Sequence, residues 1–194
     1  MFRVQRGWSH LVGAIGTTSF DGDQMVQTQN PFTYAGASKA LPGAPPISNL
    51  TMQFQFTEMA GLGTYAVTLH GAAGKPKVGL QLQGGSIQLL LGNSDPIPTY
   101  LGIYTDVPSA TRLVHLTVDA LGNPSLWIDG IAIPLVLSVP IAALPLGPVN
   151  SIVVFSVNAA AGPARVATYD YLFVDNVVRP PTTIFCCPGG TPAA

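Results

Sequence analysis

Few side chains in this sequence have the types and the spacing that catalysis requires. Hydrolysis of a glycosidic bond takes a pair of carboxylates facing one sugar linkage, but the chain holds a single glutamate, Glu58. The histidines, His10, His70 and His115, are far apart, and none has a spacing that would converge on zinc. No Gly-x-Ser-x-Gly elbow presents an activated serine. We therefore expect no catalytic residue and a protein that is not an enzyme.

Aromatic and amide side chains raise a different possibility, the binding of sugars. Trp127, Tyr100 and Tyr104 are the aromatic residues placed to stack on a sugar ring, and Gln81 and Gln83 would supply amides. Trp127 lies within an apolar run, so alternation does not tell which face of a strand it occupies. Packing of Trp127 in the core or in an interface is the simpler interpretation.

Two adjacent cysteines, Cys186 and Cys187, stand near the end of the sequence. Their spacing neither closes a useful loop nor supplies a tetrahedral metal site. They are either plain thiols or the source of one intermolecular disulfide to a neighbouring subunit. Non-reducing electrophoresis that shows monomer alone would contradict the disulfide.

Composition restricts the remaining functions. Hydrophobic residues make up 47% of the 194 residues and charged residues only 9%, against about 25% charged in an ordinary domain. The net charge of −1 gives no field that attracts nucleic acid. The apolar run Ile131–Val149 is long enough to span a bilayer, but it contains four prolines that would break a helix. No signal peptide is recognisable at the N-terminus, so we expect synthesis in the host cytoplasm without export.

The apolar pattern predicts strands almost throughout. Asn49–Thr57 alternates apolar and polar residues, as a half-buried strand does. Gly84-Gly85 and Asp129-Gly130 are typical of tight hairpins. Further strands are predicted by the same signals, over Tyr65–His70, Val78–Gln83, Ser86–Leu91, Leu113–Asp119, Ser125–Ile128, Ile131–Leu137, Ser151–Asn158 and Arg165–Val178. So many strands predict an all-β, two-sheet antiparallel sandwich, with Pro31–Ile47 and Pro180–Ala194 irregular.

Four segments resemble the laminin G-like branch of the concanavalin A-like jelly rolls: Thr18–Val26, Leu50–Phe56, Leu113–Gly130 and Thr168–Val174. The resemblance implies a jelly-roll domain over residues 18–178, an N-terminal arm over 1–17 and a Pro-rich C-terminal arm over 179–194. The Glu-x-Asp-x-x-Glu arrangement of that fold's glycosidases is absent.

Calcium is the only cofactor that the resemblance suggests. Members of the superfamily often hold Ca²⁺ at sheet edges, where Asp21, Asp23 and Asp170 would be the ligands here. We prefer turn and edge roles for these aspartates, because no dense acidic loop of the calcium type is present.

The scarcity of charge favours a surface covered by neighbours. The main functional prediction is a structural protein of a large assembly, a virion component such as a capsid decoration, tail or fibre protein on the virion surface. Its arms would contact a coat protein and copies of itself. The residues predicted to make these contacts lie in both arms: Phe2, Arg3, Trp8, Ile184, Phe185, Cys186 and Cys187. The alternative is a lectin-like module that attaches to glycans.

Overall fold

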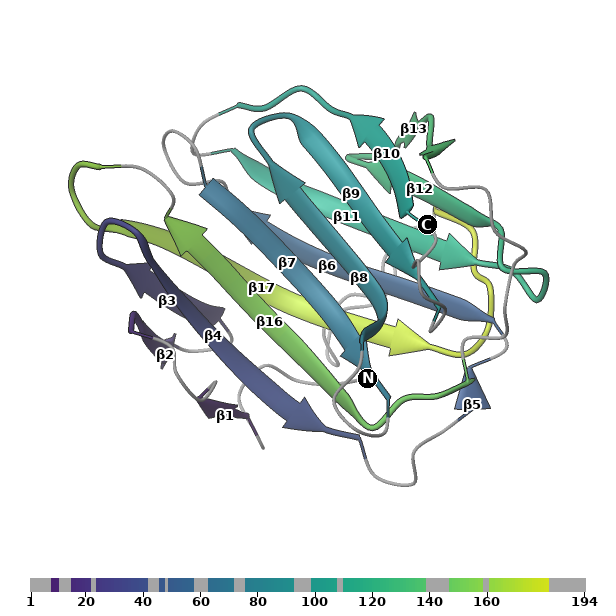
Figure 1. Ribbon diagram of the computed structural model, residues 1–194, viewed down its shortest axis with the longest axis horizontal. Helices are drawn as coiled ribbons and strands as arrows, with labels where there is room; N and C mark the ends of the chain where they lie inside the picture. The colour runs from purple at the N-terminus through teal and green to yellow at the C-terminus, as the bar shows by residue number, and fades with distance from the viewer. Residues whose placement is uncertain are drawn as a thin grey trace, which may run out of the picture.

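The structure is a computed structural model of the chain. It describes residues 8–10, 15–21, 24–41, 46–47, 49–57, 63–71, 76–92, 99–107, 110–138, 147–158 and 161–181. Every regular element in these ranges is a β-strand, and the strands form two large antiparallel sheets packed face to face (Figure 1). The prediction of an all-β, two-sheet jelly roll is therefore confirmed. Within the same ranges, no helix has the length and hydropathy needed to cross a membrane.

The larger sheet has eight strands. They are β1 (Ser9–His10), β4 (Thr33–Ala40), β7 (Gly63–His70), β8 (Pro76–Gln83), β9 (Ser86–Leu91), β10 (Thr99–Ile103), β14 (Val136–Leu137) and β16 (Ser151–Asn158). Their order across the sheet is β1-β4-β16-β7-β8-β9-β10-β14. The centre of this sheet is thus the run from β16 to β9.

The second sheet has seven strands. They are β2 (Thr17–Asp21), β3 (Gln24–Gln29), β6 (Leu50–Thr57), β11 (Thr111–Val118), β12 (Pro124–Ile128), β13 (Ile131–Ile133) and β17 (Arg165–Asp175). Their order is β13-β12-β11-β6-β17-β3-β2, so β6 lies between two strands that come much later in the chain. A separate short pair joins β5 (Pro46–Ile47) to β15 (Gly147–Pro148).

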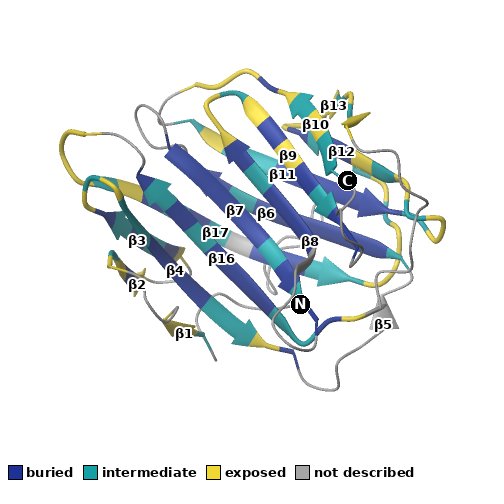
Figure 2. Cartoon of the chain, viewed as in Figure 1, coloured by how far each residue is buried: buried dark blue, intermediate teal, exposed yellow. Residues whose placement is uncertain are grey.

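The core lies between the sheets and is formed by side chains of the long strands. Figure 2 shows the buried residues of these strands in dark blue. In β6, the inward residues Leu50, Met52, Phe54 and Phe56 are at most 1% exposed, as the alternation predicts. The Phe56 ring lies 4.6 Å, centroid to centroid, from the ring of Tyr65 in the opposite sheet. Truncation of such a buried aromatic side chain to alanine costs about 3–5 kcal/mol, so these contacts hold the sheets together.

Polar side chains also join the sheets inside the core. The Ser156 hydroxyl on β16 donates to Oε1 of Gln27 on β3 at 2.6 Å, and it accepts a hydrogen bond from Nε2 of Gln29. Nε2 of Gln27 donates to the Val154 carbonyl at 3.1 Å. Buried polar groups are stable only when they are hydrogen-bonded, so this network fixes β3 opposite β16.

The two hairpin turns predicted from Gly84-Gly85 and Asp129-Gly130 are confirmed. Gly84 and Gly85 join β8 to β9 with φ of 50° and 80°, and Asp129 and Gly130 join β12 to β13 with φ of 53° and 77°. Positive φ at both central residues is the requirement of a type I′ turn. Glycine meets this requirement without strain, and Asp tolerates it better than most residues do.

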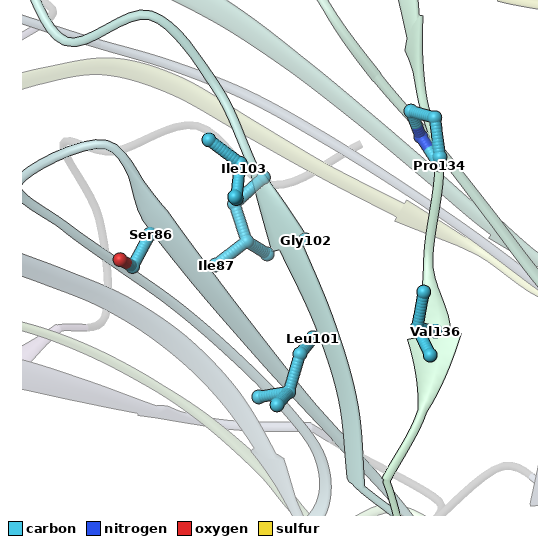
Figure 3. A pocket seen from close by; sticks show the side chains of 7 residues that line it. All are labelled: Ser86, Ile87, Leu101, Gly102, Ile103, Pro134 and Val136. Carbon is cyan, nitrogen blue, oxygen red and sulfur yellow. The ribbon is translucent and has the colours of Figure 1, made fainter.

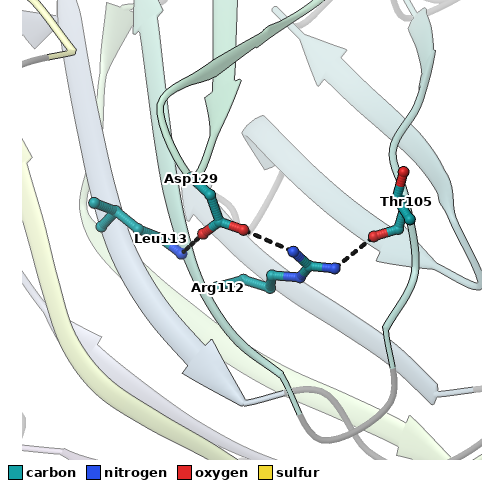
Figure 4. Close-up of polar contacts among 4 residues, drawn as sticks. All are labelled: Thr105, Arg112, Leu113 and Asp129. Atoms are coloured by element: carbon teal, nitrogen blue, oxygen red, sulfur yellow. Dashed lines mark hydrogen bonds and ion pairs between the residues drawn. The ribbon is translucent and has the colours of Figure 1, made fainter.

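Asp129 also clamps the turn to its surroundings (Figure 4). Its carboxylate accepts from the backbone N–H of Leu113 at 2.8 Å and pairs with Nη1 of Arg112 at 2.7 Å. The other guanidinium nitrogen of Arg112, Nη2, donates to the carbonyl of Thr105 at 2.5 Å. The Asp-Gly hairpin therefore has a structural role and ties the segment after β10 to β11.

Two parts of the strand assignment were wrong. The segment Pro31–Ile47 was expected to be irregular, but it contains the eight-residue strand β4. Its Gly, Ala and Ser residues have low strand propensity, and pairing along the whole of β16 overrides that preference. Ile131–Leu137 was expected to be one strand, but it is split into β13 and β14, which lie in different sheets.

Pro134 and Leu135 carry the chain from one sheet to the other along the edge of the sandwich. Pro134 cannot donate a ladder hydrogen bond, which favours a break there. Leu135 packs against the core beside Gly102 of β10. A Cβ atom at Gly102 would come within 3.1 Å of Leu135 Cδ2 and 3.2 Å of the Pro134 carbonyl oxygen. Glycine at position 102 therefore allows this close crossing.

The outer face of the seven-stranded sheet is covered at its centre by residues 176–181, which we call the C-terminal strap. The Thr51 hydroxyl donates to the Val177 carbonyl at 2.7 Å and accepts from the N–H of Arg179 at 2.9 Å. Nε2 of His115 is 3.0 Å from the Arg179 carbonyl oxygen. These contacts explain why the outward-facing Thr51, Gln53 and His115 are no more than 2% exposed.

The described portions of the two expected arms therefore lie on the sandwich. Ser9 and His10 pair with β4 as strand β1, and Thr17 already belongs to β2. At the other end, the strap begins on the seven-stranded sheet. Phe2, Arg3 and the expected contact residues from Ile184 to Cys187 lie outside the described residues, so their partner-binding role stays a prediction.

Candidate functional site

The outer face of the eight-stranded sheet carries one continuous row of side chains across six strands. Each member faces the next directly in the strand register: Phe155, Ala66, Gln81, Gln88, Leu101 and Val136. We call this set the central row. It begins with an aromatic residue on β16, passes over two amides on β8 and β9, and ends with two aliphatic residues on β10 and β14.

A groove of about 320 Å³ lies over β16, β7, β8 and β9, around the first four members of the central row. Its polar lining consists of Thr68, His70, Gln81 and Gln88. Its other lining residues are small or apolar: Ala66, Gly79, Leu80, Leu90, Val153 and Phe155. None of these residues carries a carboxylate, an ammonium or a guanidinium group. The groove therefore suits an uncharged ligand.

The polar groups of the groove are held in place by the sheet. Gln81 and Gln88 stand opposite each other on adjacent antiparallel strands, where Cβ atoms are about 4.5–5.5 Å apart. The Thr68 hydroxyl lies 2.7 Å from Nε2 of His70 on the same strand. Each glutamine amide both donates and accepts hydrogen bonds, so the pair can bind neighbouring hydroxyl groups of one ligand.

Phe155 and Gly79 give the groove its shape. Phe155 is half-buried and stands on the outward face of β16, where its ring offers an apolar surface beside the amides. Gly79 lies between Thr68 and Leu90 and leaves the groove floor without a side chain. An aromatic surface beside paired amides on an open floor is the combination that binds a flat, polyhydroxylated ring.

Trp127 lies far from this groove, on the outer face of the opposite sheet. It is half-buried and stands next to His115 in the register, with the two rings edge to face at a centroid distance of 5.5 Å. Nδ1 of His115 is 3.1 Å from Nε2 of Gln53. Burial lowers the pKa of His115, against the opposing effect of its hydrogen bond to the Arg179 carbonyl. Trp127 therefore packs beside a buried, neutral imidazole.

The two tyrosines are also not part of the groove. Tyr104 is 6% exposed and belongs to the core, which leaves its ring little surface on which a sugar could stack. Tyr100 stands on the inward face of β10 and packs against the core at its edge. Burial, and secondarily the charge of Asp119, raise the pKa of Tyr100. Of the suggested amides, Gln81 lines the groove, and Gln83 is exposed farther along the same strand.

Trp8 is half-buried at the other edge of the eight-stranded sheet. Its ring packs against the core, and Nζ of Lys39 lies 5.9 Å from the ring centroid. Much of the Trp8 side chain is therefore covered by this chain itself, with no partner subunit needed. A contact of Trp8 with another subunit stays a prediction.

The aspartates suggested as calcium ligands do not gather in the part of the chain that the structure describes. Asp21 ends β2 and Asp170 lies within β17, whereas Asp23 and the lone Glu58 are outside the described residues. Among the described residues, no group of three or more His, Cys, Asp or Glu side chains is placed to hold a metal ion. The structure thus offers no observation on which to base a calcium site.

Sequence reasoning missed Phe155 and the groove around it. Ser151–Asn158 is apolar on both faces, with Ile152 and Val154 inward and Val153 and Phe155 outward. Alternation could not show that Phe155 faces outward. The amide pair could have been predicted in part from the sequence, since Gln81 and Gln88 flank a predicted hairpin at positions equally distant from its turn.

Comparison with known proteins links the chain to solved structures alone. Neither protein-family models nor curated proteins give a match. The globular domain of calreticulin from T. cruzi aligns with a TM-score of 0.67 at 10% identity, over 91% of this chain and 87% of that one. The carbohydrate recognition domain of Emp46p, in its potassium-bound form, aligns with a TM-score of 0.59 at 13% identity, over 89% and 90%.

A structure of botulinum neurotoxin type C aligns with a TM-score of 0.62 at 9% identity, over 87% of this chain and 42% of that one. Cell entry of that toxin is dependent upon interaction with two ganglioside molecules. At such identities the likeness concerns the fold. The chain has the concanavalin A-like jelly-roll fold, which it shares with these solved structures.

Proposed function

We propose that this protein is a non-enzymatic carbohydrate-binding module and that a neutral glycan binds in the groove over β16, β7, β8 and β9. The observation that carries the proposal is the central row, in which Phe155 and the Gln81–Gln88 pair stand in register in a groove whose lining residues carry no carboxylate, ammonium or guanidinium group. The shared fold with a carbohydrate recognition domain supports the proposal.

The proposed binding mode follows from the chemistry of the row. A pyranose ring has an apolar face that stacks on an aromatic ring and equatorial hydroxyls that bind amides. Phe155 supplies the stacking surface, and Gln81 and Gln88 supply the amides. Three strand spacings separate β16 from β9, or about 14 Å at about 4.8 Å each. That length exceeds one sugar ring, so the groove would take a short oligosaccharide.

Glycan arrays followed by calorimetry test the proposal. Wild-type protein should bind at least one neutral oligosaccharide, and Gln88→Ala should weaken that binding about fivefold, because a typical hydrogen bond contributes ~1 kcal/mol. Gln55→Ala is the matched control, since Gln55 is a half-buried glutamine on the outer face of the other sheet. The proposal fails if no glycan binds, or if both variants bind as the wild type does.

A Trp127→Ala variant separates the two faces of the sandwich. Trp127 lies on the sheet opposite to the groove, so we expect it to retain glycan binding. Loss of binding in Trp127→Ala with retention in Gln88→Ala would move the site to the seven-stranded sheet.

The other functional expectations remain proposals. The comparisons give no support to a virion component that docks on a coat protein, and they favour the glycan-binding alternative. Lack of enzymatic activity, location on a virion surface and assembly with copies of itself are predictions from the sequence. Incubation of the purified protein with the glycan it binds, followed by product analysis, would test the first of them.

A further inference from the structure

We propose that the ligand is a neutral glycoside with an apolar aglycone, whose sugar lies in the groove and whose hydrocarbon tail enters a second pocket at the β10–β14 edge. This inference rests on the proposed function and adds the chemical class of the ligand. Its basis is a pocket that the sugar groove does not use.

The second pocket has a volume of about 600 Å³ and opens between β10 and the segment that follows Pro134 (Figure 3). Leu101 and Ile103 line one side, and Pro134 and Val136 line the other. Its only polar side chain is the hydroxyl of Ser86. Pockets of about 300–1,000 Å³ are the size that holds small organic ligands. The lining selects an uncharged, apolar group.

The aliphatic side chains of this pocket are unusually exposed. Leu101 is 47% exposed, Val136 is 68% exposed and Ile103 is 80% exposed. Covering such surface is favourable, because apolar side chains gain free energy when they are removed from water. A ligand that covers these three side chains would therefore gain affinity from burial alone.

The pocket continues directly from the sugar groove. Gln88, the last amide of the groove, stands opposite Leu101, and Leu101 stands opposite Val136. The chemistry of the central row thus changes from amide to aliphatic over a single strand spacing of about 4.8 Å. A ligand that follows the row would place hydroxyl groups on Gln81 and Gln88 and hydrocarbon on Leu101 and Val136.

The walls of the pocket are held by the fold. Ser138 donates from its N–H to the Thr99 carbonyl at 2.8 Å, and its hydroxyl donates to the same oxygen at 2.9 Å. On the far side, Gly102 allows Pro134 and Leu135 to approach β10 closely. The pocket is preformed, so a ligand would not need to order it, which favours affinity.

The occupant is a glycoside tail, as the continuity with the amides and the uncharged lining indicate. A second copy of the chain seated on the same three side chains is the competing occupant. The two can be separated, because only the glycoside requires the groove and the pocket together.

Matched pairs of methyl and octyl β-glycosides test this inference. The sugars are glucose, galactose, mannose and N-acetylglucosamine, and calorimetry is run below the critical micelle concentration of each octyl compound. The octyl member of at least one pair should bind about tenfold more tightly than its methyl partner, the gain expected from burial of about two methylene groups. Ile103→Ser should remove this gain.

Leu121→Ser is the matched control for Ile103→Ser. Leu121 is 73% exposed in the turn between β11 and β12, away from the pocket lining. The octyl gain should persist in this variant. Sedimentation velocity of the wild type and of Ile103→Ser should show the same oligomeric state.

Each contrary result overturns a different part. Equal affinity for methyl and octyl glycosides, with binding still weakened in Gln88→Ala, overturns the tail site and leaves the glycan groove standing. Tighter octyl binding that survives Ile103→Ser overturns the location of the tail. A wild-type dimer that Ile103→Ser dissociates, without an octyl gain, assigns the patch to a second copy. No binding of any glycoside, together with an empty glycan array, overturns both proposals.

Discussion

Gly79 offers a substitution that should raise stability and lower affinity together. A Cβ atom there would lie 3.5 Å from Thr68 Cγ2 and 3.6 Å from Leu90 Cδ1, which is ordinary van der Waals contact. Glycine within a strand costs roughly 0.5–1 kcal/mol relative to alanine. Gly79→Ala should therefore stabilise the fold by about that amount, while its methyl group begins to fill the groove floor.

The size of both effects can be set in advance. With a urea m-value of about 2 kcal/mol per molar, a gain of about 0.5–1 kcal/mol raises the denaturation midpoint by roughly 0.2–0.5 M. Gly79→Val puts more volume into the groove, and an overpacked site loses about 1–3 kcal/mol. Glycan affinity in Gly79→Val should thus fall roughly fivefold to 150-fold.

Urea denaturation and calorimetry on the same samples provide the assay. Ala132→Val, an exposed position on the outer face of the opposite sheet, is the control and should leave affinity unchanged. A lower midpoint for Gly79→Ala would show that the space around Gly79 is smaller than the distances indicate. Full glycan affinity in Gly79→Val would show that the ligand does not lie on this floor.

Three further substitutions test the contacts that stabilise the fold. Because burial lowers the pKa of His115, the unfolded state binds more protons near its ordinary value of about 6.5. The stability that His115 contributes is therefore complete above pH 6.5 and is lost as the pH falls below it, and His115→Gln should reduce this pH dependence in urea titrations. Asp129→Asn removes the charge partner of Arg112 and should cost about 1 kcal/mol, since Asp129 is partly exposed. Ser156→Ala leaves Gln27 without its buried donor and should cost about 1–3 kcal/mol.

Controls and contrary outcomes for these variants are simple. Asp106→Asn and Ser125→Ala change the same residue types at exposed positions. Each should change the free energy of unfolding by less than about 0.5 kcal/mol. If Ser156→Ala matched Ser125→Ala, the polar network between the sheets would contribute nothing. If His115→Gln and the wild type lost stability in parallel on acidification, other groups would account for the pH dependence.

Strands with a clear alternation were predictable because apolar side chains on one face meet the core, whereas the other face carries polar side chains. Leu50–Thr57 and Ser86–Leu91 have this pattern, and Gly84-Gly85 marked the turn before the second of them. Strand β4 was missed because small residues pack well only when a long partner such as β16 pairs with them. The break at Pro134 was missed because the surrounding residues are apolar whichever sheet they join.

The candidate site was harder to predict from the sequence than the fold was. A pocket on a sheet face is made by residues that are adjacent only through strand order, as Phe155 and Ala66 are. Exposed aromatic residues were expected to mark a sugar-binding site, but Tyr104 is buried in the core. The face of Trp127 depended on the register of β11 and β12, which alternation does not provide.

The place of β17 in the seven-stranded sheet has a consequence for biosynthesis. Strands β2 and β3 connect to the rest of that sheet through β17, which pairs with β3 on one side and β6 on the other. A ribosome therefore completes most of the strands before this sheet can close. Until Arg165–Asp175 emerges, one edge of β6 lacks its neighbour, and non-local pairing of this kind is slow. The nascent chain should consequently be a client of chaperones that bind apolar strand edges, and ribosome-bound fragments ending before residue 165 should show that association.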